Sequence, residues 1–88
     1  MARDDARAVA CQVADEVRDW PPQRLLASVE EDEERTVAGP GGVAYQVRIQ
    51  GWSYRADPGR MFVDITTEDG SLRAALRPEA AHVEFRLG

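Results

Sequence analysis

Hydrophobic residues recur at a helical spacing along the first twenty residues. This spacing indicates an amphipathic helix over residues 2–20, because side chains three or four apart lie on one side of a helix. Pro21 and Pro22 end the pattern, since a residue before proline is driven out of the helical region. The predicted buried face consists of Ala2, Ala6, Val9, Ala10, Val13, Val17 and Trp20.

The segment Gln23–Val29 is compatible with two structures. Its apolar residues can form one side of a short helix, or they can alternate as in a strand. We favour the helix, because Pro22 is accommodated in a first helical turn. The two apolar sets are Leu25, Leu26 and Val29 for the helix, and Leu25, Ala27 and Val29 for the strand.

From Arg35 onward the pattern changes to short alternating runs separated by turn residues. The turns are Gly-Pro-Gly-Gly at 39–42, Ala-Asp-Pro-Gly at 56–59 and Glu-Asp-Gly-Ser at 68–71. This pattern predicts an antiparallel meander over residues 35–87, of about three to five strands, with the helix on one face. The fold class is α+β with two layers, in a single domain of residues 1–88. The predicted strands are Thr36–Ala38, Val43–Tyr54, Met61–Thr67 and Leu72–Arg77, with His82–Leu87 as a further strand whose pairing is left open.

Two aromatic residues are out of step with the apolar residues that precede them. The preceding set occupies odd positions, whereas Trp52 and Tyr54 occupy even ones. If Arg55 pairs with Arg60 across the turn, Trp52 faces Val63 on the inner side of the sheet. A β-bulge near Gln50 and Gly51 reconciles the two patterns, because glycine accommodates the extra residue. We therefore expect a bulge and a largely buried Trp52. The odd set is Val43, Tyr45, Val47 and Ile49.

Composition and charge restrict the function classes. The chain is 43% hydrophobic and 31% charged, as globular domains are. No apolar run approaches the roughly 20 residues that cross a bilayer, and the charged N-terminus is unlike a secretory signal. The net charge of -5 disfavours general binding to nucleic acid or to anionic membranes. A single cysteine fits a reducing compartment, so we expect a cytoplasmic protein.

The residues that usually carry catalysis or bind metals are few. Cys11 and His82 fall in different predicted elements, both facing solvent, and no spacing resembles a zinc site. The turn Gly39–Gly42 lacks the Lys-Ser/Thr and the following helix of a phosphate loop. The acidic run Glu30–Glu34 lacks a glycine to fold it around a cation, and its like charges predict an exposed connection. We expect no catalytic residue, metal or cofactor.

The candidate binding face is the side of the sheet that points away from the helix. Arginines and an aromatic ring on such a face could bind phosphates, RNA or an acidic peptide. Asp64 and Glu84 lie among them, so cross-strand ion pairs on a solvated face are the interpretation we favour. The residues of this face are Arg48, Phe62, Arg73, Arg77 and Arg86.

The second half of the chain resembles a family of small, uncharacterised bacterial proteins. The resemblance covers about half the chain and rests on YQVRIQGWSY, a D-P-G turn, MFVDI, a D-G turn and SLRAAL. It implies an N-terminal helix followed by an antiparallel meander, and it implies no activity. The chain departs from the family pattern at Pro78–Ala81.

The function that we favour from the sequence is a non-enzymatic protein-interaction module or homodimer. The reasons are the missing catalytic set and the strand edges, which invite pairing with another chain. One alternative is an anion- or RNA-binding module that uses the arginine-rich face. Another is a small-ligand carrier or enzyme with a pocket between helix and sheet, near Trp20, Trp52 and Tyr54.

Overall fold

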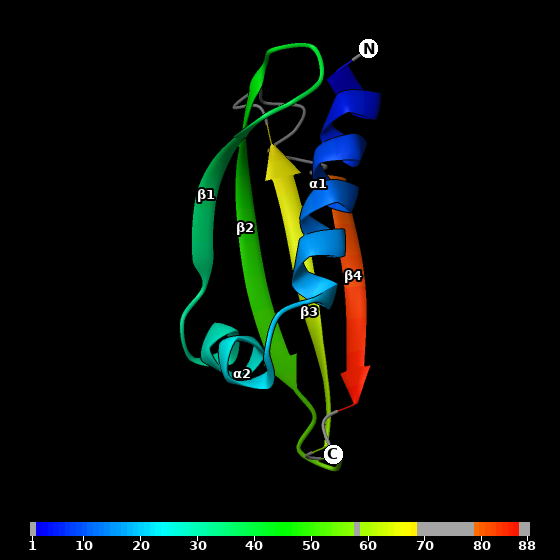
Figure 1. Cartoon of the computed structure of the whole chain (residues 1–88). Coiled ribbons are helices and arrows are strands. Elements are labelled where there is room, and N and C mark those ends of the chain that lie inside the picture. The colour runs from blue at the N-terminus through cyan, green and yellow to red at the C-terminus, as the bar shows by residue number, and fades with distance from the viewer. Residues whose placement is uncertain (1, 58, 69–78, 87–88) are drawn as a thin grey trace.

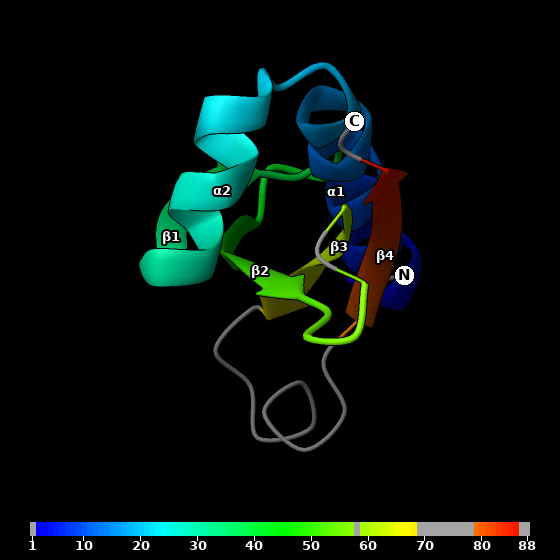
Figure 2. The same cartoon turned by 90° about the horizontal axis from the view of Figure 1, so that it is seen from below.

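The computed structural model describes residues 2–57, 59–68 and 79–86 (Figure 1). In this described part, two helices precede four strands, and both helices lie on one side of the sheet (Figure 2). The predicted two-layer α+β fold is confirmed. The elements are α1 (Ala2–Arg18), α2 (Pro22–Glu30), β1 (Glu33–Ala38), β2 (Ala44–Ser53), β3 (Arg60–Glu68) and β4 (Glu79–Arg86).

The sheet is an antiparallel meander in the order β1-β2-β3-β4. Of the described strands, β1 and β4 are therefore the outermost two. We call the side covered by the helices the inner face and the opposite side the outer face. The predicted last strand is confirmed and pairs with β3, with Val83 opposite Val63. It begins at Glu79, three residues earlier than expected, whereas the predicted strand Leu72–Arg77, most of the turn 68–71 and Leu87 lie outside the described residues.

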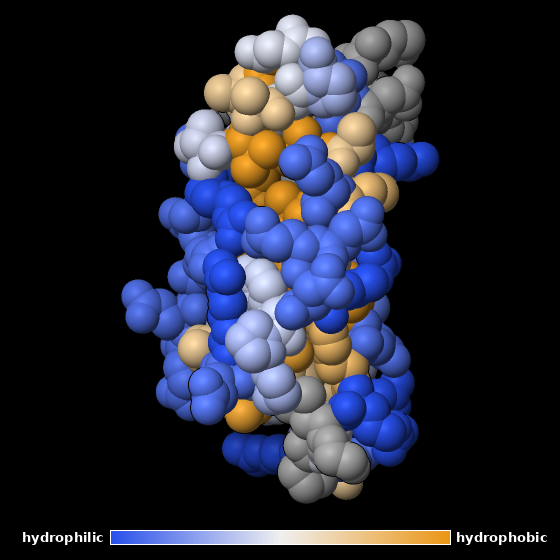
Figure 3. Space-filling model, in the orientation of Figure 1, coloured by the Kyte–Doolittle hydropathy of each residue, from blue (hydrophilic) through white to orange (hydrophobic). Residues whose placement is uncertain are grey.

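The core lies between the helices and the inner face. The predicted stripe on α1 is confirmed from Ala6 to Trp20, although the helix itself ends at Arg18. The hydroxyl of Thr67 donates to the Ala6 carbonyl oxygen at 3.1 Å and so links β3 to α1. Figure 3 views this helix-covered side, which is largely hydrophilic, with apolar atoms visible between the elements in its upper part. The largest fully buried side chains are Tyr45, Ile49, Met61, Ile65, Val9, Val17, Val47, Val63 and Thr67.

The segment that sequence patterning left open is a helix. Pro22 lies in its first turn, and Pro21 before it is extended, with φ -67° and ψ 154°. Leu25 and Ser28, three residues apart, are buried against the sheet, whereas Leu26 is 51% exposed. This spacing of buried residues is helical, so the helix that we favoured is confirmed and the strand alternative is excluded.

The acidic run does not form the single exposed connection that was expected. Glu30 ends α2 and Glu33 begins β1, which leaves only Glu31 and Asp32 between the elements. The strand starts early because Glu33 already pairs with Ile49 of β2. The Glu33 carboxylate forms ion pairs with Arg35 and with Arg24 of α2, the latter at 3.2 Å. Burial of the Glu33 carboxyl acts to raise its pKa, but the hydrogen bonds and charges of the two arginines outweigh burial and lower it.

The expected β-bulge is absent, and the expected burial of Trp52 is wrong. The β2–β3 ladder is regular from Gln46 opposite Glu68 to Ser53 opposite Met61, and Trp52 faces Phe62. Gly51 occupies the inner position, where a Cβ would stand 3.0 Å from the Val29 backbone nitrogen of α2. The strand therefore does not change step, because a glycine is what lets α2 approach the sheet. The next side chain, Trp52, points outward and is 44% exposed.

Candidate functional site

Aromatic rings gather on the outer face where β2 ends and β3 begins. The Trp52 and Phe62 rings are nearly parallel, with centroids 6.2 Å apart and an interplanar angle of 16°. The Tyr54 ring, just beyond β2, lies 5.5 Å from Phe62. We call these three residues the aromatic cluster. His82 of β4 packs on its other side, with its ring 4.7 Å from that of Phe62.

Strand register explains why these rings meet. Trp52 and Phe62 are direct cross-strand partners, and directly opposite side chains lie on the same face of a sheet. Asp64 is opposite His82 in the next pair of strands, which sets the imidazole diagonally beside Phe62. The sequence placed Phe62 on the outer face correctly but missed Trp52 and Tyr54. The unbroken alternation from Tyr45 to Gly51 was the available signal, since it points Trp52 outward.

Charged groups of both signs surround the aromatic cluster. Arg60 contacts a Glu84 carboxylate oxygen at 3.1 Å, and its guanidinium carbon lies 4.7 Å from the centre of the Tyr54 ring. The His82 Nδ1 atom is 2.8 Å from an Asp64 carboxylate oxygen, and its Nε2 atom is 3.5 Å from Glu84. All four groups are partly exposed, so these pairs orient side chains more than they stabilise the fold.

The environment of His82 favours its protonated form. The hydrogen bond to Asp64 raises the pKa of His82 above its ordinary value of 6.5, against a smaller opposing effect of burial and with help from Glu84. The pKa of Glu84 is lowered, first by its hydrogen bond to Arg60 and then by that to His82. At neutral pH a larger fraction of His82 is therefore protonated than of an isolated histidine.

Replacing Asp64 by asparagine is expected to lower the pKa of His82, measured by proton NMR titration of the imidazole. Because the folded pKa is raised, the stability from this pair is full below pH 6.5 and is lost as the pH rises through the folded pKa. The variant should therefore lose most stability in acid and little in mild alkali. Asp15→Asn on α1 is the control. If the pKa of His82 is the same in Asp64→Asn as in the wild type, the contact between His82 and Asp64 is contradicted.

The arginine-rich face is not assembled within the described residues. Arg48 is on β2 and Arg86 on β4, with β3 between them, while Arg73 and Arg77 lie outside the described ranges. The Arg48 guanidinium is bound to Asp32, with Nε 2.8 Å from the carboxylate. The predicted cross-strand ion pairing is seen at Glu84, whose partner is Arg60.

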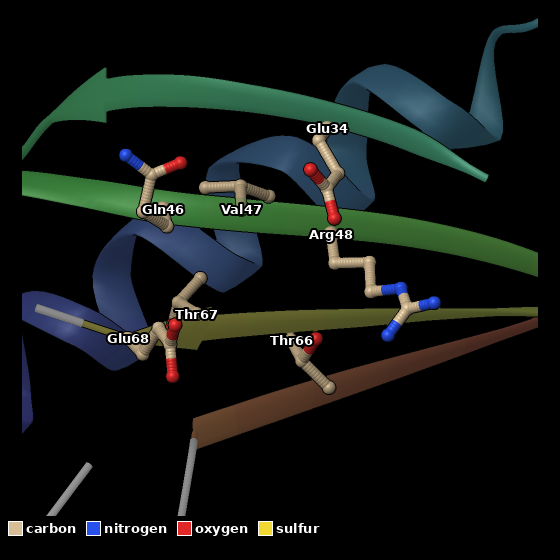
Figure 4. A pocket seen from close by; sticks show the side chains of 7 residues that line it. All are labelled: Glu34, Gln46, Val47, Arg48, Thr66, Thr67 and Glu68. Carbon is tan, nitrogen blue, oxygen red and sulfur yellow. The ribbon is translucent and has the colours of Figure 1, made fainter. Parts of the chain in front are cut away.

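A shallow hollow of about 270 Å³ opens on the outer face toward the other end of β2 and β3 (Figure 4). The charged side chains at its rim are Glu34, Arg48 and Glu68, which come from three neighbouring strands. Because both signs are present and the hollow is open, it offers no selective charge for a small ligand. Its remaining lining residues are Gln46, Val47, Thr66 and Thr67.

The structure does not bring together the residues of the predicted helix–sheet pocket. Trp20 is buried on the inner face, whereas Trp52 and Tyr54 belong to the aromatic cluster outside. Trp20 instead lines a second hollow of about 280 Å³ beside α2, where the Arg24 guanidinium carbon lies 3.9 Å from the centre of its ring. Its Nε1 atom is buried there without a hydrogen-bond partner. Trp20 and Trp52 therefore cannot line one binding pocket.

Cys11 and His82 are both exposed, as expected, and lie in different elements. No group of three or more His, Cys, Asp or Glu residues in the described ranges could hold a metal ion. Among the same residues, no helix is long and apolar enough to cross a membrane.

Comparison with protein-family models, with curated proteins and with solved structures gives no match. The resemblance to small bacterial proteins therefore stays a prediction. What the chain does has to be inferred from its own geometry, in which the aromatic cluster is the most distinctive surface feature.

Proposed function

We propose that the chain is a protein-interaction module that binds a partner protein on its outer face, around the aromatic cluster. The observation that carries the proposal is the exposure of Trp52, which is 44% accessible although it stacks on Phe62. Tryptophan and tyrosine are enriched among the residues that dominate binding energy at protein interfaces. We place this activity in the cytoplasm, because a single cysteine fits a reducing compartment.

The surroundings of the aromatic cluster suit a protein partner. The Trp52 and Phe62 rings are held by β2 and β3, so little conformational freedom is lost when an apolar side chain packs on them. Arg60 and Glu84 supply one charge of each sign at the border, and His82 adds a third polar group. An apolar centre with a polar rim is the usual anatomy of a protein interface.

The same contacts argue against nucleic acid as the ligand. The guanidinium groups of Arg48 and Arg60 are engaged by Asp32 and Glu84, so binding phosphate would require breaking both pairs. The net charge of -5 adds a general repulsion that low salt strengthens. Stacking of bases on Trp52 would have to overcome this repulsion, and RNA binding is therefore an outcome that the experiment must test.

Trp52→Ser is expected to weaken partner binding by about tenfold or more, because an interface aromatic anchor contributes more than about 1 kcal/mol. The partner would be captured from the native organism with the wild-type chain, purified, and its Kd measured by isothermal titration calorimetry. Leu26→Ser is the matched control. Leu26 is 51% exposed on α2, on the other side of the sheet. The Kd of the Leu26→Ser variant should therefore stay within about twofold of wild type.

Two results would overturn the proposal. The first is a partner affinity that falls equally in Trp52→Ser and Leu26→Ser, or that falls in neither variant. The second is single-stranded RNA that shifts in a gel at low salt with the wild-type chain and no longer shifts with Arg48→Glu. The second result would assign the outer face to nucleic acid.

A further inference from the structure

Among the residues that the structure describes, β4 is an edge strand that carries no proline or bulge against pairing. It spans eight residues, Glu79–Arg86, without proline or glycine. In natural proteins, edge strands are protected against pairing by short length, proline, bulges or charged side chains. The other edge, β1, has six residues and begins with Glu33 and Glu34, directly after Glu31 and Asp32. The β1 edge therefore has both the charge and the short length that protect an edge strand, so β4 is the edge suited to pairing.

We infer that β4 pairs antiparallel with β4 of a second copy, with Val83 on the two-fold axis. The two four-stranded sheets then form one continuous sheet across the dimer. Two-fold pairing of one strand with itself is isologous, so each favourable contact occurs twice. This surface shares His82 and Glu84 with the border of the face proposed for the partner protein, but it uses the backbone edge of β4 and leaves Trp52 on β2 free.

The alternation of side chains restricts the register. A continuous sheet requires outer-face residues to lie opposite outer-face residues, and a shift of one residue would exchange the faces. The axis can therefore pass through Val83 or through a neighbour such as His82. With Val83 on the axis, each His82 lies opposite Glu84 of the second copy. With His82 on the axis, the two imidazoles would face each other and Glu84 would lie opposite Ala80, so the His82–Glu84 contact across the axis would be lost.

The inner side of the same register is apolar. Val83 meets Val83 of the second copy, and Ala81 meets its Phe85, which extends the core layer across the axis. Val83 is buried in one copy, while Ala81 and Phe85 are partly buried and pack against the core cluster. α1 packs over β4 on this side (Figure 2). In the inferred dimer, the α1 helices of the two copies therefore lie side by side. Their exposed side chains carry both signs of charge, as Arg7, Asp15 and Arg18 do.

A charge exchange tests this register. His82→Glu puts two carboxylates opposite each other twice per dimer, and Glu84→Lys replaces the carboxylate opposite each His82 by an ammonium group. Each variant alone is expected to raise the dimer Kd about tenfold, measured by sedimentation velocity at neutral pH. In an equimolar mixture, the carboxylate introduced by His82→Glu faces the ammonium group introduced by Glu84→Lys. The second pair of that heterodimer is the native one, with Glu84 of the first chain opposite His82 of the other. The mixture should therefore form a heterodimer with close to wild-type affinity.

Recovery in the mixture separates pairing from folding, because a misfolded chain is not rescued by a second damaged one. Circular dichroism of each variant checks the fold directly. Arg48→Glu and Trp52→Ser change the outer face away from β4 and should leave the dimer unchanged. A wild-type chain that is monomeric at high micromolar concentration overturns the inference. So does a dimer that both single variants keep, or a mixture that stays monomeric.

Discussion

Replacing Gly51 by valine is expected to destabilise the fold by about 3 kcal/mol, the upper part of the range for overpacked sites. The added Cβ would overlap the Ser28 hydroxyl oxygen and stand 3.0 Å from both the Ser28 carbonyl carbon and the Val29 nitrogen. A rotamer change could move the hydroxyl aside, but the backbone of α2 can yield only if the helix shifts. The loss would then extend to Leu25, whose buried side chain anchors α2.

Urea denaturation followed by circular dichroism measures this effect. Ser53→Val is the matched control, since Ser53 lies two residues further along the same strand and its side chain is exposed. Valine favours strands, so the control should change stability by less than about 1 kcal/mol. In the double variant Gly51→Ala with Ser28→Ala, part of the stability lost in Gly51→Ala should return, because the overlapping hydroxyl is gone. Equal stability of Gly51→Val and Ser53→Val would contradict the close approach of α2.

Ile49→Ala is expected to cost about 2–5 kcal/mol, whereas Trp52→Ala should cost only about 1 kcal/mol. The Ile49 side chain is fully buried between β1, β3 and the helices, so its truncation leaves a cavity. The Trp52 ring has solvent on one side, and its removal forfeits mainly the stacking on Phe62. The larger side chain is thus expected to have the smaller effect on stability.

Thermal and urea unfolding of the two variants compare these effects directly. Each variant serves as the other's control, because both truncate a side chain of β2 to alanine. A Trp52→Ala loss as large as that of Ile49→Ala would mean that the ring is buried, as it would be behind a bulge. A small loss for both would place Ile49 outside the core.

Local patterns were sufficient to predict the layers of the fold. The period of Val9, Val13 and Val17 predicts which side of α1 is buried, because helix geometry relates sequence spacing directly to direction. The alternation of Met61, Val63 and Ile65 does the same for β3, and all of these residues are buried. Pro21 marks the end of the first helix within three residues.

The candidate site was predicted only in part. Phe62 lies on the outer face as expected, because its strand alternates regularly. The predicted burial of Trp52 was wrong, because the hydrophobicity of the ring was given more weight than the unbroken alternation of β2. The Arg48 pairing with Asp32 joins residues sixteen positions apart, and the Arg60 pairing with Glu84 joins residues twenty-four apart. No local spacing relates such residues.

The sequence by itself determined the first helix, the described strands and the inner face of most of them, since these follow from periodicity and from turn residues close by in the chain. Only the tertiary structure decided where α2 rests, and this contact explains Gly51. A glycine at an inner position looked like a weak point where a strand would bulge. It is instead the space that Ser28 and Val29 fill, and a missing side chain can be interpreted only when its neighbour in space is known. With Gly51 facing in, the strand stays regular, and Trp52 is left in solvent where another protein can reach it.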